Sequence, residues 1–534
     1  MKAKWLLCGM LFVSTIGLMA CMESKATEKE WETVEQERVS IHDPSILSLK
    51  DRDGRQLYYL FGSHLAQAKS KDLLTWQVPF TSEYENMRDN LIFADTDKTL
   101  KESFKWAGHN DADSAGGYSI WAPDVFWNEA YQWQDGSLGA YMYYYSATST
   151  WRRSCIGFVV SKELEGKFQY GGTIVYSGFT QKDATDGSER NTNYHKTHLK
   201  QLIKEGTLSS FSNNWARDGV TYNTDYAPNA IDPAFFTDKA GKLWMTYGSW
   251  SGGIFLLEIN PATGEPLYPG KDGKTTDGRI IDRYFGTKLA GGYHQSMEGP
   301  YIVYDQKASY YYLFATYGSL QADGGYNMRL FRSKEVTGPY VDAKGQSPIF
   351  GKTDKNEQFG VKLMGNYQFN GMDKAYKSGG HNSAFIADDG QWYLIYHTRF
   401  SGSEAHQVRV HQMVMNEEGW PLATPYEYRE PLVKGPFKKT EIVGRYEVIK
   451  HGTDNSPVVN KSLKVSLETN GQLAGELEGT WELSTKTLEI KSEGVTYRGV
   501  LAKQPEECNQ HQKVLTFSLL GDNNEVIWGS QITP

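Results

Sequence analysis

Five stretches of the chain share one pattern of apolar and polar positions. Each starts with a short run around a polar residue, enters an apolar strand, passes a turn with Asp or Gly, and continues as a second strand rich in aromatic residues. This pattern is typical of β-hairpins. The stretches start at Asp43 (HDPSILSL, then LYYLFGS), Asp124 (WAPDVFW, then YMYYYSATS), Asp232 (DPAFFTDKAGKLWMTYGS), Glu298 (EGPYIVYD, then YYYLFATYGS) and His381 (HNSAFIADDGQWYLIYH).

The repetition predicts one architecture for most of the chain. Repeats at intervals of this order indicate units that cannot bury their faces alone and must pack in an array. We predict a five-bladed β-propeller over residues 38–433 within an all-β chain. Because each copy begins where the innermost strand of a blade begins, the five first residues should converge on the central axis. Four of them are acids, and the fifth is a histidine.

The remaining segments differ from the repeat. Polar stretches at 81–117 and 178–228 are expected to be inserts on the propeller, and the second contains a possible short helix, HKTHLKQLIKEG, with leucines at helical spacing. A Gly-Pro pair at 435–436 indicates a linker. From 437 to 534, short alternating strands joined by Asn, Gly and Asp turns predict a small antiparallel β-barrel domain.

The first 20 residues predict export. Two lysines precede an apolar run that is shorter than a membrane span, as in a signal peptide. The sequence LMAC at 18–21 resembles a bacterial lipoprotein processing site, which implies an acylated Cys21 followed by a polar tether over 21–37. The protein would then be a cell-envelope lipoprotein, facing the surface or the periplasm, that meets the membrane only through its lipid anchor. The alternative is ordinary secretion.

Composition narrows the class of ligand. The 534 residues are 39% hydrophobic and 13% aromatic, which describes a folded β-rich protein. A net charge of -8 argues against a nucleic-acid partner and favours a neutral or mildly polar ligand. Cys155 and Cys508 are expected to be separate buried thiols, without zinc-ligand spacing. We expect a monomer.

Carboxylates that converge on one axis allow acid–base chemistry on a glycosidic bond. Inverting hydrolysis needs one carboxylate to activate water and one carboxylic acid to protonate the leaving oxygen, roughly 6.5–9.5 Å apart. A third acid nearby would raise the pKa of a proton donor by like-charge repulsion. The competing interpretation is structural, because Asp-Pro is a common turn former and a repeat can keep an acid as a cap. The residues alone leave both open.

The five motifs together resemble glycoside hydrolase family 43. Within this family they are most similar to the two-domain endo-α-1,5-L-arabinanases, which have a long insert before the third blade and a small C-terminal barrel. The resemblance covers about residues 38–534. The motifs are HDPSI at 42–46, WAPDV at 121–125, NAIDPAFF at 229–236 followed by LWMTYGSWSGGI, EGPY at 298–301 and GHNS at 380–383.

The resemblance implies roles for the acids. Asp43 would be the general base and Glu298 the general acid, and Asp232 would tune and orient that acid. Asp124 also heads a repeat, but the matching aspartate is not one of the three catalytic residues of the family, which implies a structural role.

The resemblance also implies ligands. His381 would bind a calcium ion near the axis, with waters completing the shell; alternatively it is a hydrogen-bonded turn residue. One imidazole among waters is an unusual calcium site, so the ion should support geometry and charge. Four residues match sugar contacts, although Trp121 could instead be a packing residue of its blade. They are His42, Trp121, Asn229 and Ser249.

The implied activity is inverting hydrolysis of internal α-1,5-L-arabinofuranosyl linkages in arabinan or arabino-oligosaccharides. An exo-acting arabinofuranosidase or β-xylosidase on the same fold is an alternative, because the inserts could close a groove into a pocket. A non-catalytic surface glycan-binding protein is another, since a fold does not specify its function.

Overall fold

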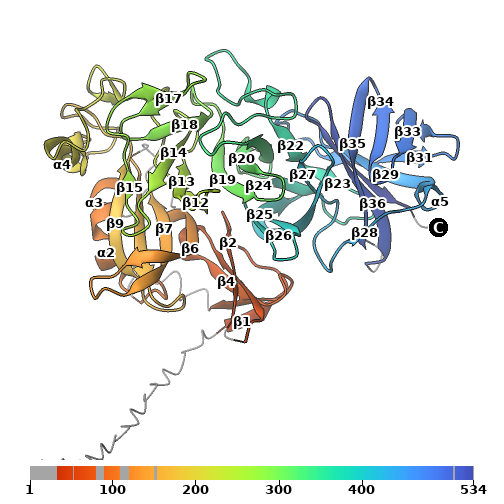
Figure 1. Ribbon diagram of the computed structural model, residues 1–534, viewed down its shortest axis with the longest axis horizontal. Helices are drawn as coiled ribbons and strands as arrows, with labels where there is room; N and C mark the ends of the chain where they lie inside the picture. Colours follow the sequence, from red (N-terminus) through yellow and green to blue (C-terminus); the bar gives the residue numbers. More distant parts are fainter. Residues whose placement is uncertain are drawn as a thin grey trace, which may run out of the picture. The chain divides into compact units, whose positions relative to one another are not determined.

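The computed structural model describes residues 33–51, 53–79, 89–108, 120–148, 153–508 and 511–532 (Figure 1). The predicted signal peptide and Cys21 lie outside these ranges. The described residues belong to one compact unit, Glu32–Pro534. In this part of the chain, no helix has both the length and the apolar character needed to cross a membrane.

Residues 33 to 423 form successive antiparallel sheets in a propeller-like arrangement (Figure 1). The first two sheets contain β1 (Thr33–Gln36), β2 (Ser45–Lys50), β3 (Gln56–Phe61), β4 (Gln67–Ser70) and β5 (Trp76–Pro79), then β6 (Ile120–Gln132), β7 (Leu138–Ala147), β8 (Cys155–Ser161) and β9 (Gln169–Tyr176). The third contains β12 (Ala234–Thr237), β13 (Leu243–Tyr247), β14 (Ile254–Ile259), β15 (Pro266–Leu267), β16 (Gly273–Lys274), β17 (Ile280–Asp282) and β18 (Gly286–Ala290).

The last two sheets of this region follow the same plan. They contain β19 (Glu298–Asp305), β20 (Tyr310–Tyr317), β21 (Asn327–Ser333) and β22 (Val361–Met364), then β23 (Tyr367–Gln368), β24 (Tyr376–Ile386), β25 (Trp392–Phe400), β26 (Ser403–Met415) and β27 (Pro421–Ala423). In all five sheets the predicted hairpin is confirmed as an antiparallel pair: β2–β3, β6–β7, β12–β13, β19–β20 and β24–β25.

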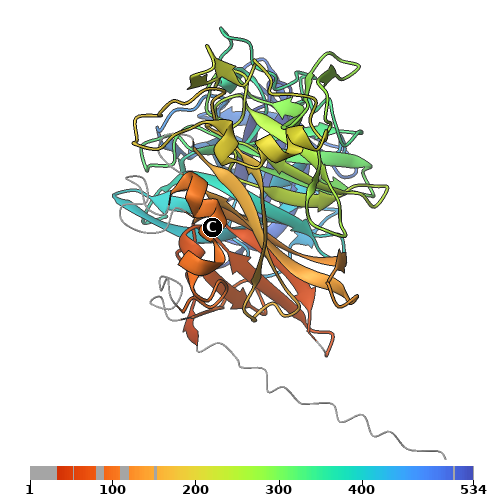
Figure 2. The same ribbon diagram turned by 90° about the vertical axis from the view of Figure 1, so that its left-hand side faces the viewer.

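Two parts of the chain depart from the simple repeat. Strand β1 lies within the segment expected to be a tether, and it pairs with β5 at the edge of the first sheet. The first insert carries helices α2 (Thr96–Thr99) and α3 (Lys101–Ala107). Helix α3 packs on β7 and β8, and the Ser103 hydroxyl lies 2.8 Å from that of Tyr145 in β7. Figure 2 shows these helices in orange beside the strands of the second sheet.

The second insert contains the predicted helix. It forms a 3-10 turn at Tyr194–Lys196 and α4 (Leu199–Lys204), followed by the small hairpin of β10 (Ala216–Arg217) and β11 (Thr221–Tyr222). Leu199 is fully buried, in line with the leucine spacing. Further 3-10 turns lie at Ser63–Leu65 and Asn356–Gln358.

The C-terminal domain is a closed eight-stranded barrel, because β35 pairs with both β34 and β36. Its elements are β28 (Val433–Lys434), α5 (Lys439–Ile442), β29 (Gly444–Lys450), β30 (Asn460–Lys461), β31 (Leu463–Leu467), β32 (Gln472–Gly475), β33 (Gly479–Leu483), β34 (Leu488–Ser492), β35 (Val495–Pro505), β36 (Lys513–Gly521) and β37 (Val526–Gln531). Strands β28 and β30 lie outside the closed ring; β30 extends the fifth sheet by pairing with β23.

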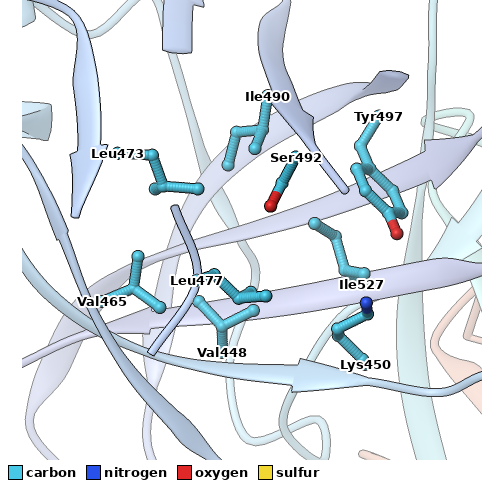
Figure 3. Close-up of a pocket in the computed structure, with 9 residues that line it drawn as sticks. All are labelled: Val448, Lys450, Val465, Leu473, Leu477, Ile490, Ser492, Tyr497 and Ile527. Atoms are coloured by element: carbon cyan, nitrogen blue, oxygen red, sulfur yellow. The ribbon is translucent and has the colours of Figure 1, made fainter. Parts of the chain in front are cut away.

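The barrel interior is packed with side chains. The cavity between Leu473, Ile490 and Ile527 has a volume of about 10 Å³, too small for a sugar (Figure 3). Outside the barrel, Trp528 and Val514 join the hydrophobic core of the fourth and fifth sheets. The domain is therefore built to pack against its neighbour rather than to enclose a ligand.

Candidate active site

Five left-handed kinks surround the site. A positive φ is uncommon for a residue with a side chain and is found where surrounding contacts enforce it. The kink lies two residues before the innermost strand in the first and third sheets and within that strand in the other three. The next residue is a proline or, once, an asparagine. The kinks are Asp43 (φ 53°) before Pro44, Ala122 (39°) before Pro123, Asp232 (58°) before Pro233, Gly299 (56°) before Pro300 and His381 (46°) before Asn382.

The positions of the kinks show that the first residues of the five repeats are not all equivalent. Asp43, Asp232 and His381 occupy the kink itself. Asp124 comes two residues after its kink, and Glu298 comes one residue before its kink. The four acids therefore do not occupy one repeated position, and their side chains leave the backbone at different points.

The backbone N–H of every kink is bound by the neighbouring sheet. Each bond runs from one sheet to a side chain of the sheet before it, and the first sheet binds the fifth. The donors and acceptors are Asp43 N–H to His397 Nδ1 (3.2 Å), Ala122 N–H to Ser63 Oγ (2.8 Å), Asp232 N–H to Ser146 Oγ (3.0 Å), Gly299 N–H to Asp232 Oδ2 (3.1 Å) and His381 N–H to Thr316 Oγ1 (2.9 Å). We call this set the kink ring.

Asp43 is held as a carboxylate. The Ser63 hydroxyl donates to its Oδ2 at 2.5 Å, and His42 Nδ1 lies 2.9 Å from the same oxygen. His381 Nδ1 lies 3.0 Å from Oδ1. Burial would raise the pKa of Asp43, but the charges and hydrogen bonds of His381 and His42 outweigh it and hold the pKa well below its usual value.

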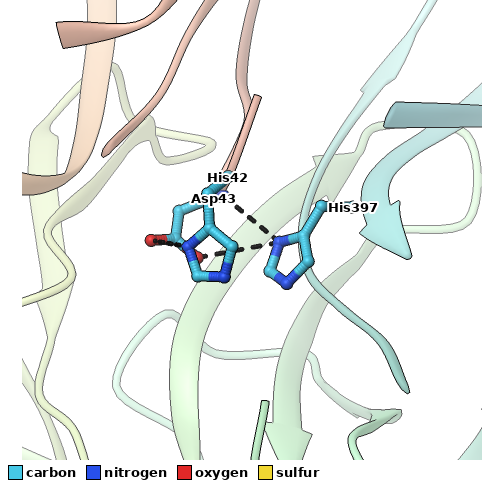
Figure 4. Close-up of side chains that lie close together, drawn as sticks. All are labelled: His42, Asp43 and His397. Carbon is cyan, nitrogen blue, oxygen red and sulfur yellow. Dashed lines mark hydrogen bonds and ion pairs between the residues drawn. The ribbon is translucent and has the colours of Figure 1, made fainter. Parts of the chain in front are cut away.

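His42 and His397 both contact Asp43 (Figure 4). Their rings stack with centroids 3.9 Å apart and planes inclined by 28°. Lone pairs lie in the ring planes, so stacked rings do not direct two nitrogens at one ion. In addition, His397 Nδ1 already accepts the N–H of Asp43. This pair therefore supports the carboxylate and is a poor metal chelate, although its donor atoms lie close together.

Asp232 is buried and lies within the electrostatic influence of the other two acids. Its Oδ2 accepts the N–H of Gly299, which follows Glu298 in the chain. Burial, and then the negative charges of Glu298 and Asp43, raise the pKa of Asp232 to about 7, against the opposing effect of His381. Because neighbouring carboxylates resist ionising together, the cluster retains a proton near neutral pH.

Glu298 is only partly buried and accepts three side-chain hydrogen bonds. The Tyr326 hydroxyl donates to Oε1 at 2.6 Å, while Trp250 Nε1 and Ser249 Oγ donate to Oε2 at 2.8 and 3.1 Å. Sequence reasoning missed Trp250 and Tyr326. Trp250 directly follows the predicted contact Ser249, which is a usable signal, whereas Tyr326 precedes the third strand of its sheet and has no local signal.

Asp124 has a different environment. Its Oδ1 accepts the Ser45 hydroxyl at 2.6 Å and the Val125 N–H at 3.1 Å, and its Oδ2 accepts the Phe235 N–H at 2.7 Å. Ser45 belongs to the first sheet and Phe235 to the third. The carboxylate therefore links three sheets, and burial raises its pKa to about 6.

The predicted sugar contacts divide into two groups. His42 and Ser249 touch the acids, as given above. Asn229 is buried, and its Oδ1 accepts the Ser177 hydroxyl at 3.3 Å. Trp121 is half-buried, and within the described ranges its Nε1 has no hydrogen-bond partner.

His381 is the residue that suits a cation. Burial alone would lower its pKa, but Asp43, Asp232 and Glu298 raise the pKa to about 9. The same negative field favours a metal ion. Its Nδ1 donates to a carboxylate, the arrangement that orients metal-binding histidines, and this leaves Nε2 for a ligand. Close to the axis, a cavity of about 20 Å³ between Asp43, Asp232 and His381 has room for about one water.

Comparisons with known proteins identify the family of this chain. A model of glycosyl hydrolases family 43 matches residues 209–421, and a model of a C-terminal lipocalin-like domain matches residues 425–529. The chain is 39% identical over 508 residues to the extracellular endo-alpha-(1->5)-L-arabinanase 2 of Bacillus subtilis, covering 92% of this chain and 93% of that protein. It is 37% identical over 507 residues to the extracellular endo-alpha-(1->5)-L-arabinanase of Thermotoga petrophila, covering 92% and 93%.

Solved structures agree over both domains. The crystal structure of the endo-1,5-alpha-L-arabinanase from Thermotoga petrophila superimposes with a TM-score of 0.74 at 35% identity, covering 93% of this chain and 99% of that chain. This protein belongs to glycosyl hydrolases family 43.

Proposed function

We propose that this protein is an inverting endo-α-1,5-L-arabinanase that hydrolyses internal arabinofuranosyl linkages of arabinan. Relatives that are 37–39% identical over 92% of the chain carry this activity in their names. The observation that carries the proposal is the cluster of Asp43, Asp232 and Glu298, in which each acid is held differently.

Asp43 is the general base of the proposed reaction. It removes a proton from water while the water oxygen attacks the anomeric carbon, so it must be ionised. Its depressed pKa and its bonds to Ser63, His42 and His381 meet this need. These bonds also fix the direction of its free lone pairs.

Glu298 is the general acid. As the bond between the anomeric carbon and the leaving oxygen breaks, Glu298 gives that oxygen a proton, and the product keeps the water oxygen with inverted configuration. Its partial exposure allows contact with a substrate. Asp232 orients it through the Gly299 N–H and keeps a proton within the acid cluster near neutral pH.

Sugar binding is assigned to groups around this cluster. His42 and Ser249 contact both an acid and, in this proposal, a sugar hydroxyl. The Nε1 of Trp121, which has no hydrogen-bond partner among the described residues, supplies a donor. Asn229, held by Ser177, completes the set from the third sheet.

A calcium ion bound through His381 is part of the proposal. The protein would offer one imidazole nitrogen, and water would supply oxygen ligands. When bound, the ion adds positive charge beside the acids and holds the His381 ring in place. Full activity and unchanged melting temperature after treatment with a chelator, with calcium restoring nothing, would remove this element.

We also propose that the propeller has five blades and that the protein is exported. The innermost strands β2, β6, β12, β19 and β24 contact one another in sequence and β24 contacts β2, which supports five blades. Relatives described as extracellular support secretion. The signal peptide of residues 1–20, acylation of Cys21 and a monomeric state remain proposals, testable by mass spectrometry of the mature protein and by light scattering.

Digestion of linear arabinan tests the activity. The wild type should release mixed arabino-oligosaccharides from the earliest time points, and Asp43→Asn should bind arabinan without cutting it. Release of arabinose alone at the start would reject endo action. Cleavage by Asp43→Asn at the wild-type rate would reject the assigned base.

A further inference from the structure

A loop of the C-terminal domain contacts the segment that carries Tyr326, a hydrogen-bond partner of the general acid. Residues 451–459, between β29 and β30, lie against the segment that carries Tyr326. Gly325 adopts φ +68°, and a Cβ on it would lie 2.0 Å from the carbonyl oxygen of Asn455. The loop backbone is therefore in direct contact with the residue next to Tyr326, and only glycine fits there.

The side-chain oxygen of Asn455 binds this same segment. Its Oδ1 accepts from Asn327 Nδ2 at 3.1 Å and from Arg329 Nη2 at 3.0 Å. Asn327 Nδ2 also donates to the Gly325 carbonyl at 2.8 Å. The bonds thus hold the residues on both sides of Tyr326, whose hydroxyl donates to Glu298 Oε1.

The side-chain nitrogen of Asn455 leads to Glu298 by a second route. Its Nδ2 donates to Asn356 Oδ1 at 2.9 Å. Asn356 Nδ2 in turn donates to the carbonyl and the hydroxyl of Ser296, at 2.6 and 2.9 Å. Ser296 stands two residues before Glu298. One amide therefore braces both the backbone that carries the acid and the tyrosine that binds its carboxylate.

A buried charge keeps the loop in place. Arg329 is fully buried, and its Nη2 donates to the carbonyls of Thr453 and Asp454 at 2.6 and 3.1 Å. Without the loop this guanidinium would lose these acceptors, and a buried cation without partners is costly. The loop is thus anchored independently of the Asn455 amide.

We propose that Asn455 of the C-terminal domain is a positioning residue for the general acid, acting on Glu298 through Tyr326 and through Ser296. The proposal rests on the role proposed above for Glu298. It gives the barrel a part in the reaction although its interior has no room for a sugar: it fixes the direction in which the acid presents its proton.

The test compares two substrates. Asn455→Ala should lower kcat on linear arabinan by about tenfold to a hundredfold with KM nearly unchanged, because small displacements of a catalytic group have effects of this size. On an arabino-oligosaccharide with a 2,4-dinitrophenyl leaving group the loss should shrink to about threefold or less, because this group departs without protonation. Asn455→Asp, which keeps the acceptor for Arg329, should recover part of kcat.

A matched control comes from the same interface. The Ser518 hydroxyl donates to the Ala423 carbonyl at 2.8 Å, a bond between the barrel and the fifth sheet that does not lead to Glu298. Ser518→Ala should keep wild-type kcat on both substrates. The proposal would be overturned if Asn455→Ala and Asn455→Asp lost equal activity on both substrates. It would also be overturned if Ser518→Ala lost as much activity, or if the Asn455 variants had a lower melting temperature with unchanged kcat.

Glu298→Gln distinguishes a failure of the proposed general acid from a failure of the proposed role of Asn455. If Glu298→Gln cleaves arabinan at the wild-type rate, the proposed acid is wrong. If Glu298→Gln is inactive on arabinan while both Asn455 variants keep full kcat there, the acid stands and only the positioning role of Asn455 fails. Should Asn455→Ala fail to fold, the substrate comparison is made with Asn455→Asp.

Discussion

The second and third sheets each bury an aspartate beside the axis, and the two carboxyl groups have opposite surroundings. Asp124 accepts bonds from Ser45, Val125 and Phe235, which occupy both of its oxygens. For Asp232, the bond to its carboxylate comes from the Gly299 N–H, and its neighbours are other acids. In this pair, Asp124 is bound by donors from three sheets and links them, whereas Asp232 lies beside the other acids of the cluster and is placed to share a proton with them.

Asp124 and Asp232 differ in their partners, and not in their burial. Both side chains are buried and both have raised pKa values, about 6 for Asp124 and about 7 for Asp232. Burial and the direction of the shift therefore do not distinguish them. The groups that bind or surround each carboxylate distinguish them, and variants of the acids test that difference.

The largest effect is expected for Glu298→Gln. Glutamine keeps the shape but cannot donate the acid proton, so kcat on linear arabinan should fall by about a thousandfold or more. Reducing-end release under saturating substrate measures it. If the variant lost only affinity for arabinan and kept its kcat, the cluster would be a binding site. Asp232 would then have no catalytic role to set against the structural role of Asp124.

Asp232→Asn should have the next largest effect. The amide cannot share the proton of the acid cluster, although it can still accept the Gly299 N–H, so kcat should fall by about a hundredfold with a small change in KM. Steady-state kinetics across pH provide the measurement. Activity equal to wild type would make Asp232 a structural residue like Asp124.

Asp124→Asn should affect stability more than activity. One of its two carboxylate oxygens becomes an NH₂ group that faces a donor, either Ser45 or Phe235, which should cost about 1–3 kcal/mol in the free energy of unfolding. Chemical denaturation measures this loss, and kcat should stay within about twofold of wild type. A fall in kcat as large as that of Asp232→Asn would show that the partners do not separate the two roles.

The smallest effect concerns pH. The folded-state pKa of Asp124, about 6, lies above its usual value of 3.8. The folded state thus binds this proton more tightly, and the associated stability is fully present below about pH 4 and lost as pH rises through about 6. The melting temperature of wild type relative to Asp124→Asn should therefore decline between pH 4 and pH 7 and be flat above pH 7. A difference independent of pH would contradict the raised pKa.

Much of the hairpin plan was predictable because it is local. Proline after Asp43 and Asp232, with aromatic strands behind, identified both the turns and their place in the repeat. The register of Glu298 was not predictable in the same way. Alignment by acids hides that Gly299, and not Glu298, takes the kink, because φ is a property of the folded backbone.

The remaining site residues depend on contacts distant in sequence. Tyr326 reaches Glu298 across the fourth sheet, and Asn455 reaches Arg329 from another domain, so no spacing or periodicity indicates either contact. The barrel strands were visible as alternating patterns. Strands β35 and β36 form a hairpin, which is a local contact. The barrel closes only when β29 pairs with β37, and the sequence gives no sign of that distant pairing.

The bond between Asp43 and His397 has a consequence for biosynthesis. The proposed base is residue 43, and the imidazole that accepts its N–H is more than 350 residues later, in the fifth sheet. During synthesis, the hydrogen bond to this N–H cannot form until the fifth sheet has docked on the first. The site of the proposed base is therefore completed only after most of the propeller-like region has been made.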